Sequence, residues 1–188
     1  HGCEYDAEKR AYRHRLTGDC PCGVRHDPNP APLSGAQGSR KPKRKVTGTW
    51  TYEDADGQPY MRVKRLETED GMKTYIQERF EGGSWKRGLG GRKPILYRLS
   101  DLIEADPSHP VLIPEGEKHV DRLRELGFVS TCNPMGAEKW RSSYNEHLRG
   151  RDVVLIPDND EPGDRHVKKI AASLWDVAGS TEIVELPG

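Results

Sequence analysis

The sequence contains no run of 18 consecutive apolar residues and no apolar leader. Both a membrane-spanning helix of ordinary length and a secretory signal peptide would need such a segment. Cysteine is also scarce, with four residues in the chain, at Cys3, Cys20, Cys22 and Cys132. We therefore expect a soluble protein of a reducing compartment, and interpret it as cytoplasmic.

Apolar residues make up only 33% of the 188 residues, against 32% charged residues. Such a chain can bury only a modest core, so we expect folded and poorly packed parts rather than one uniform globule. An initiator methionine is lacking as well, because the sequence begins at His1. We expect it to be a fragment of a longer protein.

The net charge of zero conceals an asymmetry along the chain. Residues 1–50 carry ten Lys and Arg against five Asp and Glu, whereas residues 111–188 carry ten against fourteen. A basic N-terminal part and an acidic C-terminal part suit an N-terminal arm that binds a polyanion, joined to a C-terminal site that binds a cation.

Residues 27–45 hold four prolines and no aromatic or β-branched residue. They bury too little apolar surface to offset the entropy of ordering, which predicts a flexible linker behind an N-terminal segment, residues 1–26. The last six residues, 40–45, include five cations. Binding to a phosphate backbone and simple solvation explain these cations equally well.

Residues 46–109 predict a small antiparallel β-rich subdomain. Alternating runs at 46–53, 59–67 and 73–80 are separated by Asp-Gly or Gly-Gly turns, a pattern typical of hairpins. The stretch 82–100 then has cations but no acid, with Trp85 and Tyr97 among them. Its candidates for binding nucleic acid are Lys86, Arg87, Arg92 and Lys93. Alternatively, this stretch is the polar face of a sheet, with Trp85 as its core anchor.

Residues 110–188 predict an α/β domain with a small parallel sheet. Apolar runs at 111–114, 128–132, 153–156 and 182–186 are the expected strands. Apolar residues at helical spacing predict helices at 116–126, 137–148 and 163–174 between them. This alternation indicates a Rossmann-like sheet with right-handed crossovers.

Carboxylates follow two of these strands, Glu115 after the first and Asp158 and Asp160 after the third. Ligands of such sheets bind beyond the carboxyl ends of the strands. Clustered carboxylates repel one another unless a cation lies between them, and oxygen ligands suit Mg²⁺ or Mn²⁺. The alternative is that Asp158 and Asp160 begin a turn and N-cap the next helix.

Two more cations lie near this edge in sequence. Lys118 comes one turn into the helix after Glu115, and Lys139 follows a loop, 133–136, that ends the second strand. Both could reach a bound phosphate. Solvent exposure of Lys118 and an ordinary strand–helix turn at 133–136 explain the same pattern.

The segments IPEGEKHVDRLRELG (113–127), TCNPMGAEKW (131–140) and VVLIPDNDEPGDRHV (153–167) resemble the TOPRIM domain of phage and plasmid primases and primase-helicases. The resemblance spans about 110–186, and GLGGRKPILYRLSDLI (88–103) is similar to what precedes TOPRIM in those proteins. It implies that Glu115, Asp158 and Asp160 bind the catalytic metal.

The implied activity is nucleotidyl transfer from nucleoside triphosphates, in synthesis of a primer on single-stranded DNA during replication of a phage, plasmid or mobile element. TOPRIM also occurs in nucleases and in non-catalytic nucleic-acid-binding modules, and both stay open. A Gly-x₄-Gly-Lys-Ser/Thr stretch is lacking, so any helicase partner lies outside this chain.

Primases of this group often carry an N-terminal zinc module, which makes residues 1–26 a possible remnant of one. The candidate ligands are Cys3, Cys20, Cys22 and His26. One residue separates Cys20 from Cys22, where zinc sites usually have two, so reduced thiols are the alternative. Cys132 ends an apolar strand and is expected in the core.

Overall fold

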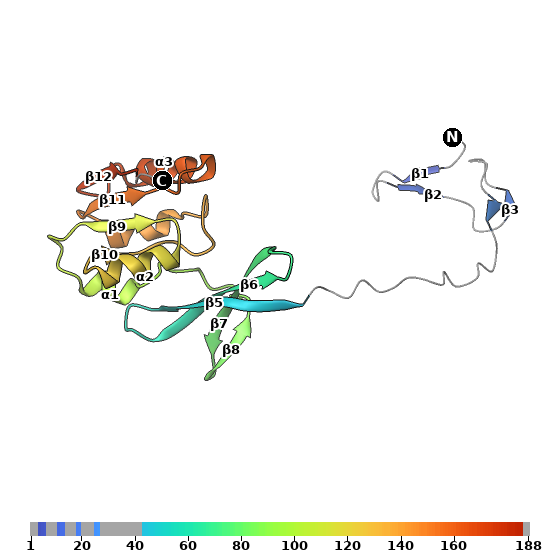
Figure 1. The fold of residues 1–188 in the computed structure, drawn as a ribbon, viewed down its shortest axis with the longest axis horizontal. Helices are drawn as coiled ribbons and strands as arrows, with labels where there is room; N and C mark the ends of the chain where they lie inside the picture. The colour runs from blue at the N-terminus through green and yellow to red at the C-terminus, as the bar shows by residue number, and fades with distance from the viewer. Residues whose placement is uncertain (1–3, 7–10, 14–17, 20–24, 27–42, 186–188) are drawn as a thin grey trace. The chain divides into compact units, whose positions relative to one another are not determined.

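A computed structural model gives the structure of the chain, and it describes residues 4–6, 11–13, 18–19, 25–26 and 43–185 (Figure 1). The chain divides into two compact units, His1–Pro42 and Lys43–Gly188. In the first, short strands pair antiparallel: β1 (Glu4–Asp6) with β2 (Ala11–Arg13), and β3 (Gly18–Asp19) with β4 (Arg25–His26). The second unit holds the candidate site.

An antiparallel sheet forms the first part of the second unit. Its strands are β5 (Arg44–Glu53), β6 (Pro59–Thr68), β7 (Lys73–Glu81) and β8 (Ser84–Arg87), in the order β5-β6-β7-β8. Gly57 and Gly71 in the turns have φ of 72° and 84°, which glycine adopts without strain. The predicted hairpins are present, and β5 begins inside the segment predicted as linker.

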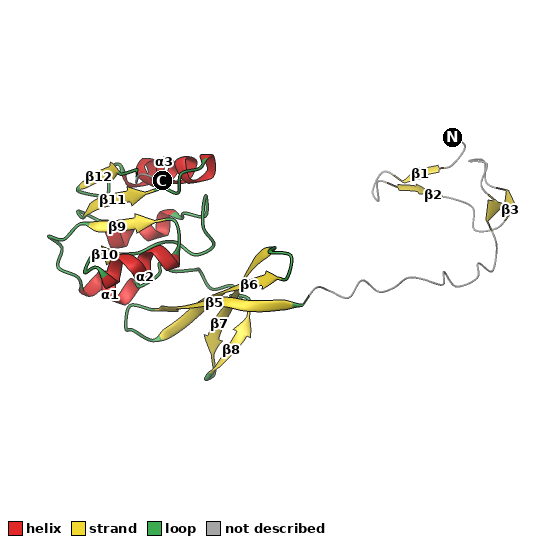
Figure 2. Cartoon of the chain, in the orientation of Figure 1, coloured by secondary structure: helices red, strands yellow, loops and turns green. Residues whose placement is uncertain are grey.

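A parallel sheet with helices follows, as predicted for an α/β domain (Figure 2). Its strands are β9 (Val111–Pro114), β10 (Val129–Ser130), β11 (Asp152–Ile156) and β12 (Ser180–Ile183), in the order β10-β9-β11-β12. The helices are α1 (Leu99–Glu104), α2 (Glu117–Glu125) and α3 (Glu161–Leu174). Among the described residues, no helix is long and apolar enough to cross a membrane.

The helix predicted over 137–148 is wrong in type and length. The structure has a 3₁₀ helix, η1 (Ser142–Leu148), preceded by an irregular segment. Glu138 has a φ of 63°, which an α-helix cannot accommodate, so the predicted helix cannot run through this residue. Trp140 and Tyr144 are nevertheless buried, and their rings pack edge to face at 5.3 Å. The apolar spacing therefore identified core residues but not the backbone that carries them.

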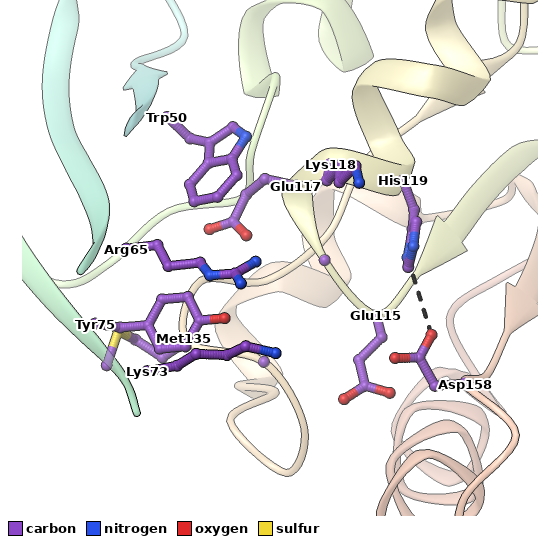
Figure 3. A pocket seen from close by; sticks show the side chains of 12 residues that line it. Trp50, Arg65, Lys73, Tyr75, Glu115, Glu117, Lys118, His119, Met135 and Asp158 are labelled. Carbon is purple, nitrogen blue, oxygen red and sulfur yellow. Dashed lines mark ion pairs between the residues drawn. The ribbon is translucent and has the colours of Figure 1, made fainter. Parts of the chain in front are cut away.

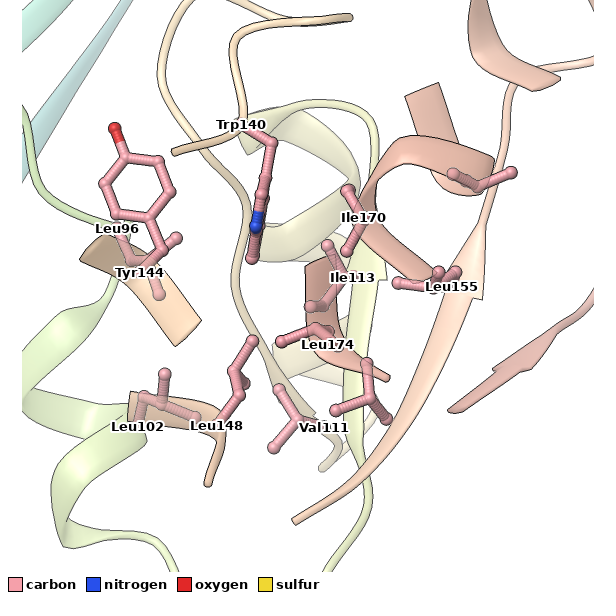
Figure 4. Packing of buried hydrophobic residues seen from close by; sticks show 12 residues of the cluster. Leu96, Leu102, Val111, Ile113, Trp140, Tyr144, Leu148, Leu155, Ile170 and Leu174 are labelled. Carbon is pink, nitrogen blue, oxygen red and sulfur yellow. The ribbon is translucent and has the colours of Figure 1, made fainter. Parts of the chain in front are cut away.

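Two apolar clusters hold the second unit together. The larger packs α3 and η1 against β9 and β11, and Leu96 and Leu102 join it from the segment before β9 (Figure 4). The smaller links the antiparallel sheet to α2, and consists of Tyr52, Met61, Val63, Tyr97, Val120 and Cys132. Cys132 is fully buried, as expected. This second cluster sets the antiparallel sheet beside the edge of the parallel sheet where the acids lie.

Candidate active site

Glu115 and Asp158 meet at the carboxyl edge of the parallel sheet. Strands β9 and β11 are neighbours, and their last residues, Pro114 and Ile156, are partners in the register. The chain therefore delivers Glu115 and Asp158 to the same place, and both line one cavity of about 520 Å³ (Figure 3).

The carboxylate of Glu115 is in an unfavourable electrostatic environment. Its Oε2 atom is buried and has no hydrogen-bond partner. Burial raises the pKa of Glu115, and the negative charges of Asp158 and Asp160 raise it further. A buried, unpaired carboxylate oxygen beside two acids is costly unless a proton or a cation neutralises it.

Asp160 has a structural task that sequence analysis offered as the alternative. Its side chain accepts a hydrogen bond of 2.8 Å from the backbone N–H of Gly163 and so N-caps α3. A Cβ atom at Gly163 would lie 2.6 Å from the backbone oxygen of Asp158, so this position requires glycine. Asp160 does not line the cavity with Glu115, but its charge still acts on that carboxylate.

Asp158 is half exposed and faces a histidine of α2. The Nδ1 atom of His119 lies 3.9 Å from Oδ1 of Asp158 (Figure 3). Within the residues that the structure describes, no group of three or more His, Cys, Asp and Glu side chains is arranged to hold a metal. Two carboxylates are nevertheless a suitable donor set for Mg²⁺, which is usually bound by one or two carboxylates, water and substrate phosphates.

The wall opposite the acids comes from the antiparallel sheet. It presents two aromatic rings, Trp50 and Tyr75, and two cations, Arg65 and Lys73 (Figure 3). Arg65 and Tyr75 are register partners on β6 and β7. A Cβ atom at Gly48 would lie 2.5 Å from the indole of Trp50, so the ring lies over this glycine.

Sequence analysis did not select these four wall residues. Their alternation within the predicted strands was a usable signal, since Trp50 lies two residues from the buried Tyr52 and Arg65 two residues from the buried Val63, on the same face of the sheet. Which cations of a hairpin face the acids depends on how the sheet packs against α2, however, and no local pattern contains that information.

The end of the cavity is formed by the start of α2 and by a tight loop. Gly116 is the N-cap of α2 and makes no side-chain cap, and Lys118 follows it in the cavity lining. Met135 and Gly136 line the other side, and Met135 has a φ of 70°. The positive end of the α2 dipole and Lys118 therefore lie at this end of the cavity, together with the acid Glu117 in the first turn of the helix.

The other basic residues predicted to bind nucleic acid do not line the cavity. Lys86 pairs with Glu81 at 2.8 Å, and Arg92 donates to the backbone oxygen of Phe80 at 2.9 Å. Arg87, Lys93 and Lys139 are exposed. Trp85 is half-buried beside Phe80, with its ring centre 4.4 Å from the Arg62 guanidinium. Trp85 thus packs against Phe80 and Arg62 on the sheet, and it is not part of either apolar cluster of the described residues, so it is not the core anchor of the alternative interpretation.

Glu117, the second acid after β9, also lines the cavity, and it connects the two sheets. It is buried, and its Oε1 accepts a hydrogen bond of 2.7 Å from the hydroxyl of Tyr52 on β5. Burial raises the pKa of Glu117. The two acids of the Glu-Gly-Glu segment thus have different environments, although only one residue separates them.

Comparison with known proteins finds a phage relative. The Gene 57 protein of Mycobacterium phage D29 is 34% identical over 88 residues, which are 46% of this chain and 55% of that protein. The chain thus spans about half the length of this relative. No protein-family model matches the sequence.

A solved structure is also similar, namely the primase fragment of the bacteriophage T7 primase-helicase protein. The TM-score is 0.46 and the sequence identity 17%, and the match covers 76% of this chain and 56% of that one.

The zinc prediction concerns residues outside this site. Cys3, Cys20 and Cys22 lie outside the described residues, and for His26 only the backbone, in β4, is described. Zinc binding by this segment stays a prediction.

Proposed function

We propose that this chain carries out metal-dependent nucleotidyl transfer on single-stranded DNA, as in primase-like synthesis of a primer. The supporting observation is one cavity lined by the three carboxylates of Glu115, Glu117 and Asp158, and also by two cations and two aromatic rings from the antiparallel sheet. The TOPRIM-like motifs that contribute Glu115 and Asp158 indicate the type of chemistry.

Glu115 and Asp158 would hold Mg²⁺, or Mn²⁺, with the charge of Asp160 adding to the attraction. The unpartnered Oε2 of Glu115 is the atom that such a cation would satisfy. A divalent cation bound there would neutralise phosphate charge and lower the pKa of an attacking hydroxyl.

The opposite wall would bind the nucleic acid and the nucleoside triphosphate. Lys73 and Arg65 would pair with phosphates, although Arg65 also pairs with Glu67 at 3.1 Å, and Lys118 at the start of α2 would add positive charge. Trp50 and Tyr75 offer ring faces on which bases can stack without regard to sequence. A helicase domain or protein outside this chain would supply the unwound template.

The test is an assay with single-stranded DNA, labelled NTPs or dNTPs, and Mg²⁺ or Mn²⁺. We expect new oligonucleotides from the wild-type protein, and a loss of about 100-fold or more in Asp158→Asn, because the cation loses a charged ligand. Asp152→Asn is the matched control, since Asp152 begins the same strand far from the acidic edge and keeps its partner Ser180 as an amide.

Other products would support other functions. Shortening of the DNA that depends on Asp158 would identify a nuclease with the same site. DNA binding without any product, equal in the wild-type protein and in Asp158→Asn, would contradict catalysis and indicate a non-catalytic binding module.

A further inference from the structure

The imidazole of His119 lies beside the two carboxylates of the proposed metal site. His119 belongs to the first turn of α2, where its backbone N–H donates to the oxygen of Gly116 at 3.0 Å. Its side chain is directed toward Asp158, and Glu115 lies beside them (Figure 3). All three line the cavity of about 520 Å³, and His119 and Asp158 also line a second cavity of about 420 Å³. An ion in the first cavity would therefore meet a nitrogen donor as well as oxygen donors.

The distance between His119 and Asp158 fits a shared cation better than a hydrogen bond. Nδ1 of His119 and Oδ1 of Asp158 are 3.9 Å apart, which is beyond the hydrogen-bond range of up to about 3.2 Å. A cation that binds both atoms at about 2.1 Å accepts any separation up to about 4.2 Å. The two side chains are 56% and 50% exposed, so an ion can reach them and they are free to turn toward it.

Two other acids of this edge are engaged elsewhere. Asp160 caps α3, and Glu117 accepts a hydrogen bond from Tyr52. Glu115, in contrast, has one buried oxygen without a hydrogen-bond partner. Glu115 and His119 thus lie on either side of Asp158 as an oxygen donor and a nitrogen donor.

A nitrogen donor changes which cation a site prefers. Carboxylate oxygens and water suit Mg²⁺, whereas imidazole nitrogen suits transition-metal ions. We propose that His119 is a nitrogen ligand of the proposed metal site, and that it makes the site favour a transition-metal ion such as Mn²⁺ over Mg²⁺. This inference rests on the proposed function, and it assigns the choice of cation to a residue of α2.

The test uses Mn²⁺ alone as the probe, because electron paramagnetic resonance reports both its binding and its ligands. A histidine nitrogen bound directly to Mn²⁺ modulates the electron spin echo, so we expect this modulation in the wild-type protein and not in His119→Gln. The variant should bind Mn²⁺ about tenfold more weakly, whereas its Mg²⁺ affinity, measured by competition, should change by less than about twofold. His109→Gln is the matched control, because His109 is an exposed histidine that lines neither cavity.

The outcomes separate this inference from the proposed function. Mn²⁺ binding that requires Asp158, without nitrogen modulation and with equal affinity in the His119→Gln and His109→Gln variants, would overturn the role of His119 and leave the metal site intact. His119 would then only form an ion pair with Asp158. A modulation that persists in His119→Gln would come from another histidine and would also overturn the inference. Absence of Mn²⁺ binding by the wild-type protein would contradict the metal site itself, and this inference with it.

Discussion

At the scale of single residues, Glu115 has the least favourable electrostatic environment of the three acids at the candidate site. Its carboxylate is half-buried, lacks a partner at one oxygen, and lies in the field of two other acids. Its neighbour Glu117 is more deeply buried and yet satisfied by a tyrosine hydroxyl. A residue whose charge destabilises the fold unless a ligand is present is typical of a functional position.

Glu115→Gln should therefore stabilise the metal-free protein while abolishing its response to metal. The raised pKa of Glu115 means that the folded protein keeps a proton that the unfolded chain releases. Its contribution to stability thus falls as pH rises above the ordinary glutamate pKa. At pH 8 the variant should melt about 2 °C higher than wild type, and near pH 4 the two should converge.

The measurement is thermal unfolding at pH 4 and pH 8, with and without Mg²⁺. Mg²⁺ should raise the melting temperature of the wild-type protein at pH 8 and leave that of Glu115→Gln unchanged. Glu125→Gln, which changes an exposed acid at the end of α2, should respond as wild type does. Melting of Glu115→Gln below wild type, with its Mg²⁺ response intact, would contradict a metal role for Glu115.

At the scale of elements, the loop 133–138 is held by helix α3. The side chain of Asn133 donates to the backbone oxygen of Gly136 at 2.9 Å, and Nδ1 of His166 accepts from the backbone N–H of Glu138 at 3.0 Å. His166 is buried, and burial together with the charge of Lys169 lowers its pKa, against a smaller opposite effect of Glu138. The loop therefore depends on a neutral imidazole.

Acidification should weaken this attachment. Because the folded pKa of His166 is depressed, its contribution is complete above the ordinary histidine pKa of about 6.5 and is lost as pH falls through the folded value. Between pH 7 and pH 5, the melting temperature of wild type should fall by about 2 °C more than that of His166→Gln.

Thermal unfolding over this pH range tests the prediction, with His109→Gln as the control because His109 is an exposed histidine. Parallel curves for wild type and His166→Gln would rule out the imidazole as the source of the loss.

At the scale of the whole second unit, the cavity forms because the antiparallel sheet packs beside the parallel sheet and its helix α2. The hydrogen bond from Tyr52 to Glu117 joins β5 to α2, and the rings of Tyr52 and Tyr97 pack at 5.0 Å within the same cluster. The hydroxyl of Tyr97 donates to Asp121 of α2 at 2.9 Å. These contacts set the distance between the wall with Arg65 and the edge with Glu115.

Removal of one hydroxyl should reveal how strong this attachment is. Tyr52→Phe leaves the carboxylate of Glu117 buried without its donor, which should cost about 1–3 kcal/mol of the free energy of unfolding. Burial raises the pKa of Glu117, and the hydrogen bond from Tyr52 opposes this rise by stabilising the carboxylate. The loss should therefore be larger at pH 8 than at pH 5, because a protonated carboxyl needs the hydrogen bond less.

Denaturant unfolding at the two pH values measures the effect. Tyr60→Phe is the matched control on β6, since the Tyr60 hydroxyl donates to the backbone oxygen of Lys93 in an exposed bond of 3.0 Å. A cost for Tyr52→Phe no greater than that for Tyr60→Phe would contradict a role for this bond in joining the sheets.

Much of the fold is encoded locally and was predictable. Strand alternation with glycine turns specifies β5 to β7, and apolar runs followed by helical spacing specify β9 with α2 and β11 with α3. The prediction failed at 137–148, where the apolar spacing of Trp140, Tyr144 and Leu148 is met by a loop and a 3₁₀ helix. The spacing of apolar residues predicts which residues are buried. The backbone conformation at 137–148 depends instead on the positive φ of Glu138 and on the hydrogen bond from its backbone N–H to His166.

The acidic edge was determined by the sequence itself, because parallel strands that end together must bring Glu115 and Asp158 together. Only the tertiary structure decided the rest of the site. In the structure, Asp160 caps α3 and Glu117 accepts a hydrogen bond from Tyr52. Arg65 and Lys73 line the cavity with the acids, whereas Lys86 and Arg92 do not. The reason is physical: strand ends follow from local pattern and register, whereas the partner of a side chain depends on how separate elements pack.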